Sequence, residues 1–188
     1  GSASAFGIAS ACLALAIAGR VTATFIPRSP AADPSLRINW NPVSETWRNL
    51  VIAARDRAVL HSLMGISWLW FFGSVFLTSF APFTRDVIGG NENVVTLLLA
   101  VFSVGIAAGA LACERMSARR VEIGLVPFGS IGMTVFAADL WLASRSLSPT
   151  GVRDVAAFVS DGTSLRLMAD LFLLSLFSGF YSVPLYAL

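Results

Sequence analysis

Long runs of uncharged residues alternate along this chain with short segments that carry its charges. A helix needs about 20 mainly apolar residues to cross the hydrocarbon core of a bilayer. Five runs approach or exceed that length, and in the second of them His61 is the only titratable group. They are residues 1–19, 58–84, 94–113, 123–138 and 171–188. The pattern predicts an all-α membrane protein with about five transmembrane helices.

The charged segments divide the chain into three parts. Residues 1–25 are expected to form one transmembrane helix. Residues 26–57 form a linker with a short surface helix, and residues 58–188 hold four further spans. These four spans are predicted at about 58–83, 94–113, 121–144 and 165–188.

The linker contains its own helix signal. Three prolines in "IPRSPAADP" stop any preceding helix, and Ser44 is the expected N-cap of a new one, with Glu45 in its first turn. Apolar residues from Trp47 to Ala54 then recur at helical spacing, with arginines on other faces. This pattern fits an amphipathic helix at the membrane surface. It fits equally the cytoplasmic start of the next span.

Composition strengthens the membrane interpretation and excludes several other classes. The chain of 188 residues is 56% hydrophobic but only 13% charged, whereas a soluble domain is about one-quarter charged. Its basic residues are all arginines in short loops, which gives no stripe for nucleic acid. Cys12 and Cys113 lie in separate apolar runs without a CxxC or Cys/His cluster, so neither a metal nor a cofactor is expected.

Arginine counts near the span ends predict the orientation of the chain. The loops after the first and third spans, with Arg20, hold nine arginines, and the opposite side holds four. Since cytoplasmic loops are enriched in Lys and Arg, the first set is expected inside. The first span would then run from outside to inside.

Glycines mark the expected close contacts between helices. Gly105 and Gly109 form a GxxxG pair, and Gly129 lies in the glycine-rich stretch "GLVPFGSIG". Glycines four apart share one helix face and let a neighbouring backbone approach closely. These three residues are the predicted helix-packing positions.

The loop around residues 114–122 has two interpretations. Its arginines alone would hold a plain cytoplasmic turn on the inner side. Its spacing also resembles a loop motif of the major facilitator superfamily, although that motif usually has Gly where Ala110 and Ser117 stand and is one residue shorter. The resemblance implies a two-state latch of charge-assisted contacts. The gating-loop candidates are Glu114, Arg115, Arg119 and Arg120.

A wider resemblance covers almost the whole chain. "VEIGLVPFGSIG" and "GFYSVPLYAL" are its most specific parts, and "DPSLRINWNP" and "GISWLWFFG" agree with it. The chain resembles bacterial lysophospholipid transporters of the major facilitator superfamily, especially the form fused to acyltransferase and acyl-ACP synthetase domains. The resemblance implies a twelve-helix transporter, of which this fragment would supply the sixth span, the central linker and spans seven to ten.

Two acids and one tryptophan are candidates for a substrate path. Charges inside spans are costly, so they are usually paired or functional. Asp139 would lie near the outer interface beside Trp141, as an interfacial residue or as a substrate or proton site. Asp170 is four residues after Arg166, which favours a local ion pair. Trp68 belongs to the aromatic second span that could line the path.

The leading hypothesis is therefore transport of lysophospholipid across a bacterial inner membrane for reacylation. Its expected partners are membrane lipid, the lysophospholipid substrate, the remaining half of the transporter and fused acyltransferase domains. One alternative is a non-transporting anchor for such domains, and another is a facilitator-type transporter of an unrelated solute. No enzyme is expected within the chain: Ile66 stands where an acyltransferase would need an Asp after His61, and any acyltransferase or ligase chemistry would lie outside it.

Overall fold

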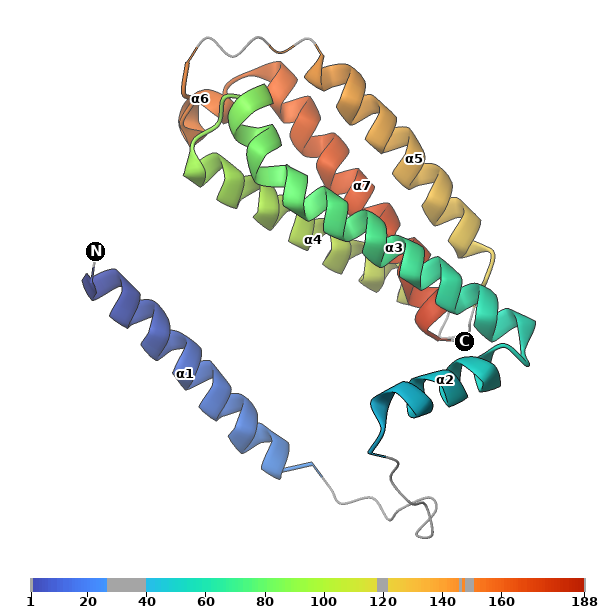
Figure 1. The fold of residues 1–188 in the computed structure, drawn as a ribbon. Helices are drawn as coiled ribbons and strands as arrows, with labels where there is room; N and C mark the ends of the chain where they lie inside the picture. The colour runs from blue at the N-terminus through green and yellow to red at the C-terminus, as the bar shows by residue number, and fades with distance from the viewer. Residues whose placement is uncertain (1, 27–39, 118–121, 146, 148–150, 188) are drawn as a thin grey trace. The chain divides into compact units, whose positions relative to one another are not determined.

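The computed structural model describes residues 2–26, 40–117, 122–145, 147 and 151–187 (Figure 1). Every regular element within those ranges is helical, apart from one isolated β-bridge between Gly90 and Arg153. The elements are α1 (Ser2–Thr24), α2 (Pro42–Ala53), α3 (Arg57–Pro82), the π-helix η1 (Phe83–Val87), α4 (Glu92–Met116), α5 (Leu125–Ser144), α6 (Val155–Val159) and α7 (Gly162–Tyr186).

Five of these helices are long and apolar enough to cross a membrane: α1, α3 with η1, α4, α5 and α7. Their outer faces carry large apolar side chains, such as Trp68, Trp70 and Ile131, which are 64 to 68% exposed. A surface this apolar is unsuited to water but suited to lipid. The predicted all-α membrane protein with five spans is therefore confirmed.

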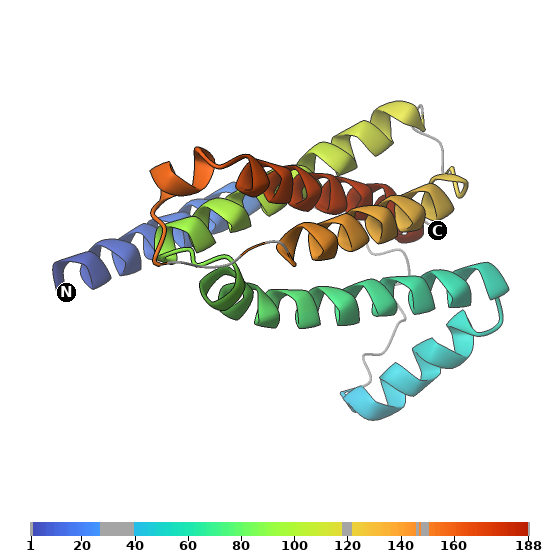
Figure 2. The ribbon, with the colours of Figure 1, turned by 90° about the horizontal axis from the view of Figure 1, so that it is seen from above.

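The chain forms two compact units, Gly1–Glu45 and Thr46–Leu188. In the first unit, the described side chains of α1 are all exposed. In the second unit, α7 lies centrally and packs extensively against α4 and α5, while α3 contacts α7 over a shorter stretch (Figures 1 and 2). The core is accordingly concentrated on α7, whose buried residues include Leu167, Leu171 and Leu174.

Glycines allow the backbones of α4 and α5 to pack directly against α7. A Cβ added to Gly109 would overlap the backbone of Leu176, and one added to Gly105 would overlap the Ser175 side chain. On the other seam, a Cβ on Gly129 would lie 2.6 Å from the backbone nitrogen of Tyr181. These glycines act as the small interface residues that membrane helix packing requires.

The helix ends differ from the predictions in informative ways. Asn41, not Ser44, caps α2: its side-chain oxygen accepts hydrogen bonds from the backbone N–H groups of Val43 and Ser44 at 3.1 and 3.3 Å. Pro42 then occupies the first helical position, where its missing N–H costs nothing. The second span continues beyond residue 83 as η1, and the last span begins at Gly162.

Candidate functional site

An apolar cavity of about 250 Å³ lies among α3, α4, α5 and α7, near the end where α3 leads into η1. Its walls are almost entirely apolar. The polar groups of the lining side chains are the hydroxyls of Ser79 and Ser144 and the indole nitrogen of Trp141. The apolar walls include Phe76, Phe80, Leu140, Leu167, Leu171 and Leu174. Such a cavity suits a hydrocarbon chain better than a polar solute.

A second cavity of about 350 Å³ follows along the same side of the bundle, between α3, α5 and α7. Its lining mixes apolar with polar groups: Trp68, Leu69, Phe72, Ser130, Met133, Thr134, Ala137 and Tyr181. Phe72 and Ala137 line both cavities, so the two are adjacent chambers of one groove. We call this feature the α3–α5 groove, with an apolar chamber and a mixed chamber.

Two long-range hydrogen bonds hold α3 against α7 beside the mixed chamber. The Tyr181 hydroxyl donates to the Gly65 carbonyl at 3.2 Å, and Trp70 Nε1 donates to the Tyr186 hydroxyl at 2.6 Å. Ser130 and Thr134 donate instead to carbonyls of their own helix at 2.9 and 2.8 Å. Their hydroxyl oxygens therefore remain available as acceptors on the wall of the groove.

Three ionisable side chains gather on the seam between α5 and α7. Arg166 donates from Nε to Asp139 Oδ2 at 3.2 Å and from Nη2 to Asp139 Oδ1, which makes a bidentate ion pair. Asp170 lies beside this pair and is 4% exposed. The favoured local pairing of Arg166 with Asp170 is therefore replaced by a pair between helices, because the α5–α7 seam brings Asp139 within reach.

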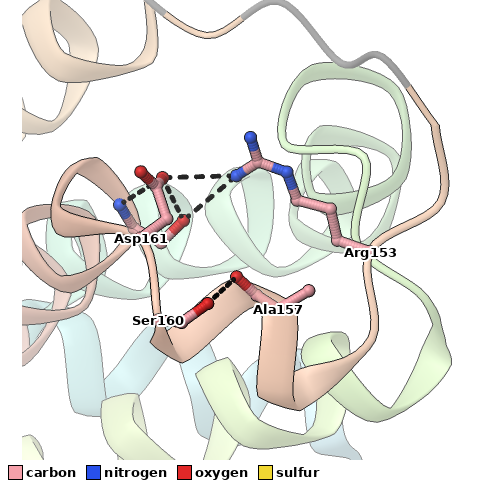
Figure 3. Close-up of polar contacts among 5 residues, drawn as sticks. Arg153, Ala157, Ser160 and Asp161 are labelled. Carbon is pink, nitrogen blue, oxygen red and sulfur yellow. Dashed lines mark hydrogen bonds and ion pairs between the residues drawn. The ribbon is translucent and has the colours of Figure 1, made fainter.

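Residues Arg153 and Asp161 form a second polar cluster, at the loop end of the bundle (Figure 3). Arg153 Nη1 lies 3.3 Å from both Asp161 Oδ2 and Ser164 Oγ. The Arg153 backbone also pairs with the loop after η1: its N–H donates to the Gly89 carbonyl at 2.7 Å, and its carbonyl accepts from Asn91 at 3.0 Å. We call this arrangement the Arg153 clamp, since it ties the η1–α4 loop to the start of α7.

The clamp fixes the charge state of Asp161, which also caps α7. Its carboxylate accepts hydrogen bonds from the Ser164 hydroxyl at 2.9 Å and from the Ser164 N–H at 3.2 Å. The bond from the Ser164 hydroxyl contributes most to lowering the pKa of Asp161, and the Ser164 N–H and the Arg153 guanidinium lower it further. Asp161 is thus ionised throughout the neutral range.

The gating-loop candidates are only partly described. Glu114 and Arg115 lie in the last turn of α4 with exposed side chains. Within the described ranges, neither side chain forms an ion pair. Arg119 and Arg120 lie outside the described residues, so the proposed latch stays a prediction.

Sequence reasoning missed several groups that the structure brings together. Tyr181, Ser130 and Thr134 line the mixed chamber with the predicted Trp68. Their signal was weak: isolated hydroxyl groups in apolar spans, spaced so that Ser130 and Thr134 share a helix face. Of the predicted acids, Asp139 and Asp170 lie together on the α5–α7 seam but do not line either chamber. Among the described residues, no cluster of three His, Cys, Asp or Glu side chains could hold a metal ion.

The fold and groove define a helical membrane protein with a groove along its side, one chamber apolar and the other mixed. In an alignment of 181 positions that covers 94% of its length, the chain is 28% identical to the lysophospholipid transporter LplT of Serratia proteamaculans. The chain spans about 40% of the length of that relative. No family model matches the chain, and no solved structure matches it.

Proposed function

We propose that this chain is part of a transporter that moves lysophospholipid across the bacterial inner membrane so that it can be reacylated. The observation that carries the proposal is the α3–α5 groove. A lysophospholipid has one hydrocarbon chain and a polar head group. Its path through a protein therefore needs an apolar slot joined to a lining with hydrogen-bonding groups.

The two adjacent chambers each supply one of these requirements. The apolar chamber is lined by phenylalanine and leucine side chains that would replace the hydrocarbon surroundings of an acyl chain. The mixed chamber adds the hydroxyl groups of Ser130, Thr134 and Tyr181, whose oxygens can accept hydrogen bonds from the glycerol hydroxyl group of the lipid. Trp68 covers the wall of this chamber with an amphipathic ring.

The similarity to a protein named as a lysophospholipid transporter supports the same substrate class. Because the chain spans about 40% of that relative, the complete path would include helices beyond those described here. We propose that the rest of the transporter, and acyltransferase domains acting on the delivered lipid, are its partners. The bound substrate and membrane lipid would compete for the groove, and any acyl-transfer chemistry would lie outside this chain.

The charged end of α4 would control access in this proposal. Glu114 and Arg115 are exposed there, where they can contact a neighbouring helix in one conformation and release it in another. Arg119 and Arg120, next along the chain, would complete the latch. Exchanging charge-assisted contacts is a sufficient basis for two states of similar free energy.

The test is a leaflet-translocation assay with the full-length protein in proteoliposomes. Fluorescent lysophospholipid is placed in one leaflet, and its movement is followed by extraction of the accessible fraction. We expect a rate well above that of protein-free liposomes, and a slower rate for a diacyl probe with the same head group. A rate equal to that of protein-free liposomes contradicts the proposal and favours the anchor or other-solute alternatives. A non-transporting anchor also predicts that Glu114→Gln has no effect on translocation.

A further inference from the structure

Asp170 is a buried carboxyl group in a membrane-spanning helix with an unsatisfied oxygen. Its residue is 4% exposed, and its Oδ2 atom has no hydrogen-bond partner among the described residues. A carboxylate in such surroundings requires a compensating charge or a proton. Arg166, one turn earlier on α7, has both of its described side-chain hydrogen bonds directed to Asp139 instead.

Among the described residues, the surroundings of Asp170 contain one guanidinium for two carboxyl groups. Asp139 on α5 lies beside Asp170 across the seam, where it binds the Arg166 guanidinium. Among the described residues, the other charged groups on the elements packed against α7 lie at or beyond the helix ends. They are Glu92, Glu114 and Arg115 on α4, Arg57 and His61 on α3, Arg85 and Asp86 on η1, Arg145 after α5, and Arg153, Asp154 and Asp161 around α6.

We propose that Asp139 and Asp170 together form a binding site for a single proton. In the occupied state, the Asp170 carboxyl O–H donates to a carboxylate oxygen of Asp139, and Arg166 neutralises the remaining negative charge. Two carboxyl groups in contact cannot both stay ionised without a second cation. Bound in this way, the proton satisfies the free oxygen of Asp170 and leaves the cluster neutral.

Release of the proton rearranges the seam between α5 and α7. The proton leaves Asp170 for water, and two carboxylates then compete for one guanidinium. Arg166 can reach Asp170 because residues four apart lie on the same helix face. Its attachment to Asp139 weakens as a result, so proton occupancy controls how firmly α5 is held to α7.

The cluster is close enough to the helix ends for protons to exchange with water. Asp139 lies five residues before the end of α5 at Ser144, which corresponds to about 7.5 Å along a helix. The Asp139 and Arg166 side chains are 33 and 56% exposed, whereas Asp170 is covered behind them. The exposed pair thus forms the entrance, and Asp170 is the interior position of the site.

The test is infrared spectroscopy of the full-length protein in liposomes at pH 5, with a reference spectrum at pH 8. The carbonyl-stretch band of a protonated carboxylic acid should be present in the wild type and should shift in D2O. Asp170→Asn should remove the band. Asp139→Asn should also remove it, because Asp170 then ionises and pairs with Arg166. Asp86→Asn, at an exposed carboxyl group on η1, should leave it unchanged.

Two results would overturn the inference. Absence of the band in wild type at pH 5 excludes a bound proton and needs no variant to fold. Persistence of the band in Asp139→Asn shows a proton held by Asp170 alone, so no shared site exists. The infrared measurement does not involve lipid movement. Its outcome therefore tests the proton site independently of the translocation assay.

Discussion

Arg166 on α7 holds Asp139 on α5 through two hydrogen bonds, although the residues are 27 positions apart. This pair joins two membrane-spanning helices near one end of the bundle, where no other described ion pair connects them. Asp170 lies beside the pair, so in the part of the chain that the structure describes one guanidinium serves two acids. Its removal should therefore have a larger effect than removal of an ordinary surface charge.

Arg166→Gln should destabilise the protein more than the double change Asp139→Asn/Arg166→Gln. The single variant leaves two acids without a cation, whereas the double variant leaves one acid that a proton can neutralise. We expect the single variant to lower the melting temperature by about 4 °C or more in detergent. Arg85→Gln is the control, since it breaks only an exposed pair with Glu92 and should have little effect. Equal melting temperatures for the Arg166 single and double variants would contradict this account.

Gly109 should tolerate no side chain. A Cβ there would overlap the Leu176 backbone, which cannot move aside as a flexible side chain can. Gly109→Ala should therefore separate α4 from α7 and destabilise the protein by about 1–3 kcal/mol. Gly73 is the matched control, because it lies within α3 with no neighbouring atom within 4 Å of an added Cβ. Gly73→Ala should be neutral or stabilising by up to about 1 kcal/mol. Thermal unfolding of both variants decides the point.

The five spans could be predicted from sequence because the bilayer imposes length and apolarity on each helix separately. The glycine-rich stretches were likewise visible, since a small residue repeated on one face has a local period. The N-cap of α2 was harder to predict from the sequence. Ser44 and Asn41 are both good caps, and Pro42 at the first helical position decides for Asn41.

Partners across helices could not be predicted in the same way. Spacing alone pairs Arg166 with Asp170, but packing of α5 on α7 brings in Asp139. The groove is another tertiary feature: Trp68 signals an aromatic span, whereas its meeting with Ser130 and Tyr181 depends on three helices. Similarly, nothing local in the sequence relates Arg153 to Gly89, which is joined to it by a backbone hydrogen bond.

Asp161 should make stability depend on pH on the acid side of neutrality. Because hydrogen bonds from Ser164 and Arg153 lower the pKa of Asp161 below its ordinary value of 3.8, its folded carboxylate is stabilising above that value. The contribution is lost as pH falls through the lower pKa of the folded state. The melting temperature of the wild type should exceed that of Asp161→Asn at neutral pH, and the difference should shrink below about pH 4. Asp86→Asn, outside the clamp, should show no such convergence. A difference between wild type and Asp161→Asn that stays constant with pH would show that Asp161 acts only through packing.

Ala137 offers the sharpest test of the groove, because it lines both chambers and its neighbour Ala138 is exposed on another face of α5. Ala137→Trp should fill the junction between the chambers and reduce lysophospholipid translocation by about tenfold or more, since a large side chain there excludes the acyl chain. Ala138→Trp adds the same bulk on the face of α5 turned away from the groove and should leave translocation near the wild-type rate. Both variants should be checked for expression and melting temperature in detergent, so that loss of fold is separated from loss of path. If Ala137→Trp folds and translocates as fast as Ala138→Trp, the acyl chain does not pass through the α3–α5 groove.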